Sequence, residues 1–196
     1  MICSKSEDSI KLISDILKKG GIAILPTDTV YGFSGIVDLK DNKSLKTDTI
    51  IRRIKGREEN KPFIQLIANP EDIKNYTDFE IPENILKCWP GALTVIVPVK
   101  KDSPLADSCA TVAFRCPGDS WLREIIKECG APVYSTSVNR SGSPVLETFR
   151  EINDEFGHEV DVLVDDGDKK GSLPSTLILL DENGYKILRE GSVTVA

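Results

Sequence analysis

Positive charge gathers around a glycine at residues 55–61. Lys55, Arg57 and Lys61 lie within seven residues, and Gly56 separates the first two. A guanidinium can make forked contacts with phosphate oxygens, an ammonium acts as a point charge, and a glycine lets the backbone approach a ligand closely. The segment could therefore bind a triphosphate, although a solvated basic loop would have the same composition. It is not a Walker A loop, because the sequence contains no G-x-x-x-x-G-K-[ST], and no G-x-G-x-x-G follows an expected strand.

Hydroxyl and amide side chains form three further polar segments, at residues 26–32 (PTDTVYG), 135–142 (STSVNRSG) and 172–176 (SLPST). Ligands in α/β folds usually bind at strand ends and in the loops beyond them, where these segments are expected. Their hydroxyls, carboxylate and amide could bond a polar ligand. Each segment could also be a capped turn, because Thr, Asp, Asn, Ser and Gly satisfy local backbone groups. For the first segment, composition alone favours the turn.

Arg115 stands out because the rest of its expected strand is apolar. The segment 111–116 reads TVAFRC. Arginine is rarely buried without an anionic partner. That partner could be a structural carboxylate or the carboxylate of a substrate.

Several features argue against whole classes of function. Five cysteines are scattered without C-x-x-C spacing, so we expect reduced, buried or partly buried thiols rather than a zinc site. His158 is the only histidine and is expected at the surface, which leaves a Ser-His-Asp or Cys-His mechanism unsupported. The net charge of −6 disfavours a protein that grips nucleic acid through its backbone, but a local basic pocket for a small anion stays open. No signal peptide or membrane-spanning run is visible, so the cytoplasm is the expected location.

Strand and helix patterns alternate irregularly along the 196 residues. Helices are expected at residues 6–19, where Ser6 or Ser9 would form the cap, and at 45–55, 70–76, 82–88, 121–129 and 148–156. Strands are expected at residues 22–25, 63–68, 93–99, 111–116, 132–138, 160–164, 175–180 and 185–189, with a hairpin turn at 182–184. Because hairpin and crossover signals occur together, the pattern favours an α/β (α+β) fold with a mixed sheet covered by helices. We expect one domain over residues 1–196; the alternative is a core that ends near residue 160 with an appended β-hairpin.

Seven segments in order, PTDTVYG, KGR with KP, WPGALT, TVAFRCP, STSVNRSG, PST and LREG, resemble the YrdC/TsaC family of threonylcarbamoyl-AMP synthases. The resemblance runs from about Gly20 to Gly191, and the order of the segments makes it specific. It implies an open, twisted mixed β-sheet with flanking helices and a concave, positively lined cavity. It also implies a nucleotidyltransferase that makes L-threonylcarbamoyladenylate and pyrophosphate from L-threonine, bicarbonate and ATP. Other proteins would then transfer the threonylcarbamoyl group to tRNA, giving N6-threonylcarbamoyladenosine.

The resemblance also assigns site residues. The family's Lys-x-Arg and Ser-x-Asn signature, taken as catalytic, falls on Lys55, Arg57, Ser137 and Asn139. Its ATP contacts fall on Arg57, Lys61, Thr111, Asn139 and Arg189, and its L-threonine contacts fall on Thr29, Arg115, Ser137 and Ser175. A further ATP contact is expected near Glu147 or Thr148. Mg²⁺ would enter with ATP and be held mainly by the phosphates, because no carboxylate ligands are evident in the sequence.

Three positions depart from the family's pattern. Leu66 stands where longer relatives carry a histidine that contacts threonine, Val138 replaces the usual alanine of S-A-N, and Phe33 replaces a leucine. None of these changes removes a charged or hydroxyl group from the signature. The hydroxyls of Thr29 and Ser175 would bond the hydroxyl of threonine and so select it over valine.

Three other functions are alternatives to the synthase. A double-stranded RNA or ribosome-associated binding protein would use the same basic cavity without catalysis, and its RNA affinity would fall steeply with salt. A carbamoyl-transfer enzyme like the hydrogenase maturation proteins would carry additional domains and zinc-finger cysteines, which this sequence lacks. A structural partner without catalysis would not need the intact signature. We expect the synthase, with weak direct tRNA binding and no membrane association.

Overall fold

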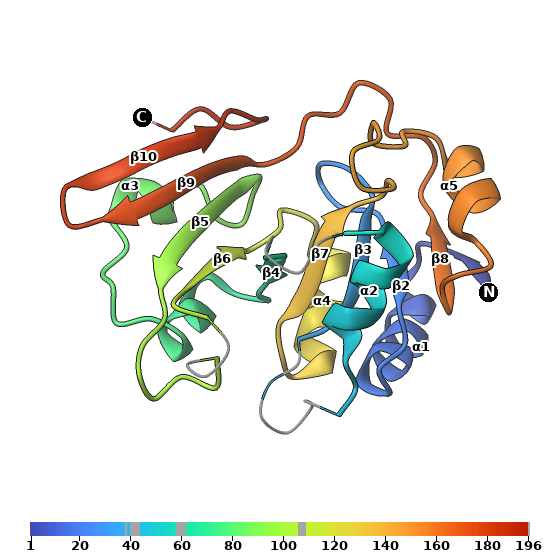
Figure 1. Ribbon diagram of the computed structural model, residues 1–196, viewed down its shortest axis with the longest axis horizontal. Coiled ribbons are helices and arrows are strands. Elements are labelled where there is room, and N and C mark those ends of the chain that lie inside the picture. Colours follow the sequence, from blue (N-terminus) through green and yellow to red (C-terminus); the bar gives the residue numbers. More distant parts are fainter. Residues whose placement is uncertain (38, 40–43, 58–61, 106–108, 196) are drawn as a thin grey trace.

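Ten strands form one sheet in the computed structural model, which describes residues 1–37, 39, 44–57, 62–105 and 109–195 (Figure 1). Their order across the sheet is β1-β8-β2-β3-β7-β4-β6-β5-β9-β10. The strands are β1 (Ile2–Ser4), β2 (Ala23–Leu25), β3 (Gly32–Ile36), β4 (Ile64–Leu66), β5 (Leu93–Pro98), β6 (Thr111–Arg115), β7 (Val133–Ser137), β8 (Val162–Asp165), β9 (Thr176–Asp181) and β10 (Gly184–Arg189).

The sheet is mixed in direction. Parallel pairing joins β1 to β8, β8 to β2, β4 to β6 and β5 to β9, while the other neighbours pair antiparallel. Figure 1 shows a strong twist, because β3 and β7 stand steeply against the direction of β9 and β10. The prediction of an open, twisted mixed sheet with flanking helices is therefore confirmed.

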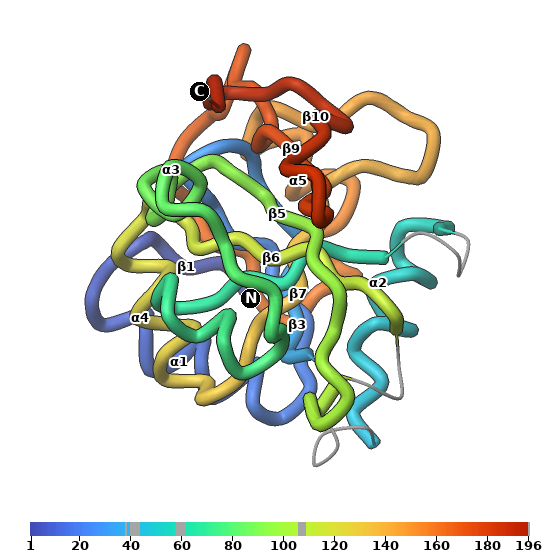
Figure 2. Tube along the Cα trace, turned by 90° about the vertical axis from the view of Figure 1, so that its left-hand side faces the viewer, coloured from blue at the N-terminus to red at the C-terminus, as the bar shows by residue number. Residues whose placement is uncertain are grey.

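Helices cover both faces of the sheet. They are α1 (Glu7–Lys18), α2 (Thr47–Lys55), the 3-10 helix η1 (Pro70–Asn75), α3 (Glu83–Leu86), α4 (Ser120–Cys129) and α5 (Phe149–Phe156). Ala23 and Leu25 of β2 join the apolar core under α1 and α4. Ile24 points the other way and joins the core that Ile51 of α2 and Phe156 of α5 complete. Figure 2 shows α1 and α4 on one side of β3 and β7, and α2 on the other.

Local signals place the element ends close to the predicted ones. Every helix and strand expected from the sequence has a counterpart, with ends that differ by no more than two residues, although 70–75 form a 3-10 helix. Ser6 caps α1, and Ser9 completes the capping box, so both expected residues take part. Gly56 ends α2 in the left-handed region, with φ of 63°.

The strands β1 and β3 were not predicted. β3 contains two glycines and follows a polar turn directly, so its composition does not signal a strand. Both glycines have a packing reason in the structure. A Cβ on Gly35 would lie 3.0 Å from the Cβ of Thr47, at the start of α2, and a Cβ on Gly32 would lie 2.8 Å from the Oγ of Ser135. β3 is nevertheless central, because it pairs with both β2 and β7.

The predicted hairpin turn joins β9 to β10, and Gly184 adopts a φ of 124° there. β9 also pairs in parallel with β5, so the hairpin continues the main sheet. Among the described residues, no helix has the length and apolar composition needed to span a membrane.

Candidate active site

Lys55 and Asn139 are hydrogen-bonded to each other beside the end of β7. Lys55 is 2% exposed at the C-terminal end of α2. Its Nζ donates to the carbonyl oxygen of Ser137, to the carbonyl of Asn139 at 2.9 Å and to Oδ1 of Asn139 at 3.0 Å. Ser137 Oγ donates to the same Oδ1 at 2.8 Å. Three of the four signature residues therefore form one hydrogen-bonded unit that fixes the loop after β7.

The environment of Lys55 disfavours its charged form. Burial first, and then the positive charge of Arg57, lower the pKa of Lys55 to about 7. The ring of Phe33 lies 5.3 Å from the ammonium. In its charged form, Lys55 has all three N–H donors on protein oxygens, so it positions the loop and has no donor left for a ligand.

Arg57, the fourth signature residue, lies just beyond the end of α2. It donates to Oγ1 of Thr136 at 3.2 Å and to the carbonyl of Pro62 at 3.2 Å, and its guanidinium carbon lies 5.0 Å from the ring centre of Phe63. Its Nε is buried without a hydrogen-bond partner. Burial first, and then the charge of Arg52, lower the pKa of Arg57. Arg57 thus keeps donors for an anion that would also offset this local positive charge.

A cavity of about 1130 Å³ lies beside Arg57. Its described lining includes four cationic residues, Lys46, Arg52, Arg53 and Arg57, and one acidic residue, Asp48, which pairs with Arg52 at 2.5 Å. The rest of the lining is Thr49, Gly56, Pro62, Phe63, Gln65, Leu105, Cys109, Ala110, Thr111, Val112 and Tyr134. The cavity brings the predicted ATP residues Arg57 and Thr111 together, whereas Lys61 lies outside the described residues.

Arg115 lies at the centre of a second polar cluster. It is 4% exposed, and it donates to Oδ1 of Asp28 at 2.6 Å, to Oγ1 of Thr29 at 2.9 Å and to the carbonyl of Gly91 at 3.0 Å. The backbone N–H of Gly118 donates to the other oxygen of Asp28 at 3.0 Å. The structural carboxylate that the sequence left open is therefore Asp28, which was not predicted as a site residue. Its only signal was its place between two threonines in the 26–32 turn.

Ser175, directly before β9, and Arg189, the last residue of β10, form a further polar group beside Thr94 of β5. Ser175 is 2% exposed, and its Oγ lies 2.7 Å from Oγ1 of Thr94. Arg189 donates to the carbonyl of Ser175 at 2.8 Å and to its Oγ at 3.3 Å. Burial, and then the charge of Arg115, lower the pKa of Arg189. Two guanidiniums thus face one region that also holds the hydroxyls of Thr29 and Ser175, which suits an anionic, hydroxylated ligand.

The 26–32 segment connects the two clusters. Gly32 pairs with Ser137 across β3 and β7, and Thr29, three residues earlier, contacts Arg115. Arg57 reaches the same strand at Thr136. Of the predicted site residues, Arg57, Ser137 and Asn139 therefore lie at the end of β7. Thr29 joins Arg115 in the second cluster, and Thr111 lines the cavity with Arg57.

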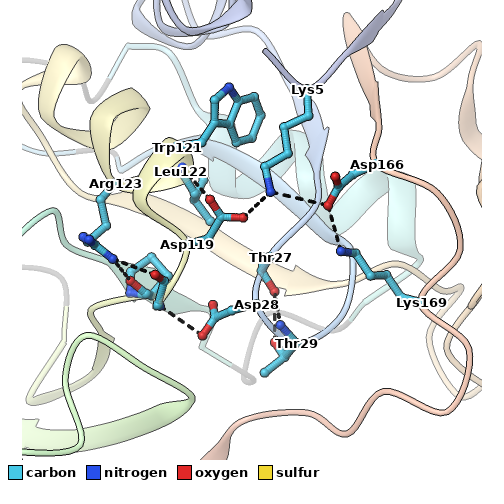
Figure 3. Close-up of polar contacts among 12 residues, drawn as sticks. Lys5, Thr27, Asp28, Thr29, Asp119, Trp121, Leu122, Arg123, Asp166 and Lys169 are labelled. Carbon is cyan, nitrogen blue, oxygen red and sulfur yellow. Dashed lines mark hydrogen bonds and ion pairs between the residues drawn. The ribbon is translucent and has the colours of Figure 1, made fainter. Parts of the chain in front are cut away.

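Ion pairs around the 26–32 turn hold the neighbouring loops (Figure 3). Lys5 bonds Asp119 at 2.5 Å and Asp166 at 3.4 Å, and Lys169 bonds Asp166 at 2.8 Å. The hydroxyl of Tyr31 accepts from the N–H of Asp166 at 2.9 Å and donates to the carbonyl of Gly167 at 2.8 Å. Burial raises the pKa of Tyr31 to about 12. The hydroxyl therefore stays protonated and ties the turn to the loop after β8.

The predicted contact near residues 147–148 and the three departures from the family's pattern occupy positions that stabilise the fold. Thr148 caps α5. The carboxylate of Glu147 accepts from the N–H of Gly171 at 3.2 Å and so helps to fix the loop that leads to β9. Leu66 is 1% exposed in the core under α1 and α4 and offers no hydrogen bond to a ligand. Val138 and Phe33 are fully buried on the other side of the sheet. The departures from the family's pattern are thus apolar packing positions.

The cysteines and the histidine have the predicted state and exposure. All five cysteines are free thiols, two of them buried, and His158 is exposed. Within the described residues, no group of three or more His, Cys, Asp or Glu side chains is arranged to hold a metal ion.

The fold and the site define an α/β protein suited to holding a multiply charged anion near its strand ends. The model of the Sua5/YciO/YrdC family, described as telomere recombination, matches residues 15–191, and the chain belongs to this family. The resemblance drawn from the sequence motifs is thereby confirmed.

Relatives with known names support the same grouping. The threonylcarbamoyl-AMP synthase of Wigglesworthia glossinidia brevipalpis is 30% identical over 95% of this chain and 95% of its own length. The threonylcarbamoyl-AMP synthase of Bacillus subtilis strain 168 is 29% identical over 97% of this chain and 56% of its own. The structure of P. abyssi Sua5 complexed with L-threonine has a TM-score of 0.83 at 26% identity, over 97% of this chain and 57% of that one. The chain thus spans slightly more than half of the latter two proteins.

Proposed function

We propose that this chain is a threonylcarbamoyl-AMP synthase, a nucleotidyltransferase that joins the carbamate of L-threonine to the adenylyl group of ATP. Relatives of similar length carry this name, and a related structure holds L-threonine. The observation that carries the proposal is a pair of cationic centres, which the 26–32 segment connects. Arg57 lines the large cavity, and Arg115 with Arg189 faces buried hydroxyls.

The reaction asks the protein mainly to hold anions together. The amine of threonine and bicarbonate give a carbamate and water. A carbamate oxygen then attacks the α-phosphorus of ATP, and the bond to the leaving pyrophosphate breaks. Positioning and the offsetting of negative charge supply most of the catalysis in such a transfer. Cations fixed by hydrogen bonds, as Arg57 and Arg115 are, suit this task.

Arg115 and its neighbours would bind threonine. A guanidinium has five N–H donors, and the protein occupies three of them at Arg115, so two are left for the carboxylate of threonine. The hydroxyls of Thr29 and Ser175 would bond the hydroxyl of the substrate. Ser137 would contact the substrate from the end of β7.

Arg57 would bind the phosphates of ATP, with Lys61 from the segment outside the described residues. Arg189 and Thr111 would complete the nucleotide contacts, and Asn139 would act from the fixed loop after β7. Asp48 is the acidic residue in the described cavity lining, and Arg52 neutralises it. We therefore assign Mg²⁺ to the phosphate oxygens of ATP, where it would offset the charge of the leaving pyrophosphate.

The product is a reactive mixed anhydride, which a separate transferase acting on tRNA would have to consume. The net charge of −6 favours weak direct binding of tRNA by this chain.

Pyrophosphate release from ATP tests the proposal. With Mg²⁺ present, release should require both L-threonine and bicarbonate. Arg57→Ala should lower the rate by about 10²- to 10³-fold, as loss of one charge-stabilising donor does elsewhere. Arg150→Ala is the matched control, because that side chain is 91% exposed on α5. No release with all three substrates saturating, together with salt-sensitive RNA binding, would instead support the binding-protein alternative.

A further inference from the structure

Gln65 presents an unsatisfied acceptor in the wall of the large cavity. The residue is 5% exposed on β4, and its Oε1 is buried without a hydrogen-bond partner. It also belongs to the lining of the cavity that holds Arg57 and Thr111. Buried polar atoms almost always have a partner, so an unpaired one at a cavity wall points to a ligand that supplies the donor.

Aromatic and aliphatic side chains surround Gln65. Its register partners are Tyr134 on β7 and Phe114 on β6. The ring of Phe63 lies 5.8 Å from that of Tyr134, edge to face, and Val112 also lines the cavity. A flat heterocycle packs well against such a wall.

The cationic residues of the same cavity come from a different element. Lys46, Arg52 and Arg53 belong to α2 and its N-cap, and Arg57 follows its C-cap. Phosphates would meet this side, while the base would meet the strand side at Gln65. The cavity, at about 1130 Å³, has room for both parts of a nucleotide.

We propose that Gln65 recognises the nucleobase, with its Oε1 accepting a hydrogen bond from the exocyclic amine of adenine. The proposal rests on the assignment of ATP as substrate under the proposed function. It concerns the amine itself, because a carboxamide can turn its NH₂ group toward the oxygen of guanine, so a comparison of ATP with GTP would not isolate it.

Nucleotide binding by the full-length chain, measured by calorimetry without threonine, tests the proposal. The probes are ATP and purine riboside triphosphate, which lacks only the amine. Wild-type protein should bind ATP about 5- to 20-fold more tightly than the analogue. Gln65→Leu should bind ATP with this advantage lost, so that both nucleotides bind alike. Arg150→Ala, which changes an exposed side chain on α5 outside this cavity, should keep the wild-type ratio.

The outcomes separate this proposal from the proposed function. If removal of the amine lowers nucleotide affinity by the same factor in wild-type and Gln65→Leu protein, the role of Gln65 is overturned, even if ATP turnover is normal. Gln65→Leu could instead lower the preference for ATP over 2′-deoxy-ATP or 3′-deoxy-ATP. Gln65 would then contact a ribose hydroxyl, and its role toward the amine would be overturned as well. If ATP neither binds nor turns over, both proposals fail. Should Gln65→Leu not fold, as judged by circular dichroism, Gln65→Met takes its place and should likewise bind both nucleotides alike.

Discussion

The ammonium of Lys55 lies 3.0 Å from Oδ1 of Asn139, although the two residues are 84 positions apart in the sequence. The same ammonium donates to the carbonyls of Ser137 and Asn139. Asn139 uses its own amide to donate to the carbonyl of Ser143 at 2.8 Å. Lys55 therefore fixes the loop after β7 by hydrogen bonds, and it would affect a ligand by positioning Ser137 and Asn139.

Replacing Lys55 by methionine should loosen this loop. The change keeps the apolar stem but leaves three partly buried oxygens short of a donor, so we expect the free energy of unfolding to fall by about 1–3 kcal/mol. ATP affinity should fall about tenfold or more, because Asn139 loses its fixed position. Urea unfolding and nucleotide titration measure the two effects. Lys87→Met, which alters an exposed lysine, is the control, and equal behaviour of both variants would contradict the role of Lys55.

The low pKa of Lys55 predicts a pH-dependent stability. The folded pKa is about 7, against 10.5 for an unperturbed lysine. Between these values the unfolded chain binds more protons than the folded one, so the free energy of unfolding should rise with pH by up to about 1.4 kcal/mol per unit. Below pH 7 both states are protonated, and the residue adds no slope.

Two measurements check this pH dependence. The Cε resonance of Lys55 in ¹³C-labelled protein should titrate with a midpoint near pH 7, and a midpoint near 10.5 would contradict the prediction. In Lys55→Met protein, the rise in unfolding free energy above pH 7 should be reduced by the contribution of this one residue.

The sequence predicted features set by local signals better than contacts between distant segments. Caps and glycine stops depend on a few neighbouring residues, which is why α1 and α2 end near the predicted positions. β3 was missed because glycines in a sequence usually indicate a turn. Only the structure shows that these two glycines make room for Thr47 and Ser135. The ordered motifs brought Thr29 and Arg115 together correctly, but the carboxylate partner Asp28 needed the three-dimensional structure. The sequence also does not indicate that the side chain of Lys55 points into the protein.

The pair formed by Arg115 and Asp28 should contribute strongly to stability. The Arg115 side chain is 5% exposed and that of Asp28 is 23% exposed, so loss of either partner leaves a partly buried charge alone. We expect Arg115→Met to lower the free energy of unfolding by about 3–5 kcal/mol and Asp28→Asn by less. The double variant should lose less than the sum of the two. The exposed pair of Arg150 and Asp154 should give a coupling of about 0.5 kcal/mol or less in the same cycle, and a similarly small value for Arg115 and Asp28 would refute the prediction.

The hydroxyls beside Arg115 and Arg189 should select threonine over valine. Thr29 and Ser175 are 5% and 2% exposed, so a valine methyl group in place of the hydroxyl would leave them partly unpaired. We expect kcat/KM to favour threonine by at least about 100-fold in the pyrophosphate assay. Ser175→Ala should narrow this ratio, whereas Ser192→Ala, on an exposed residue nearby, should not. Equal turnover of both amino acids by the wild-type protein would remove the assigned role of the hydroxyls.

Tyr31 should hold the loop after β8 against the 26–32 turn. Tyr31→Phe keeps the buried ring but removes the partner of both the Asp166 N–H and the Gly167 carbonyl, at a cost of about 1–2 kcal/mol in the free energy of unfolding. The Asp166 amide should then exchange hydrogen faster than in the wild type, while amides of β7 change less. Tyr185→Phe is the matched control, because that tyrosine is 38% exposed and makes a 3.4 Å bond to Val195. Unchanged exchange at Asp166 would show that the loop is held by the Lys5 and Lys169 ion pairs alone.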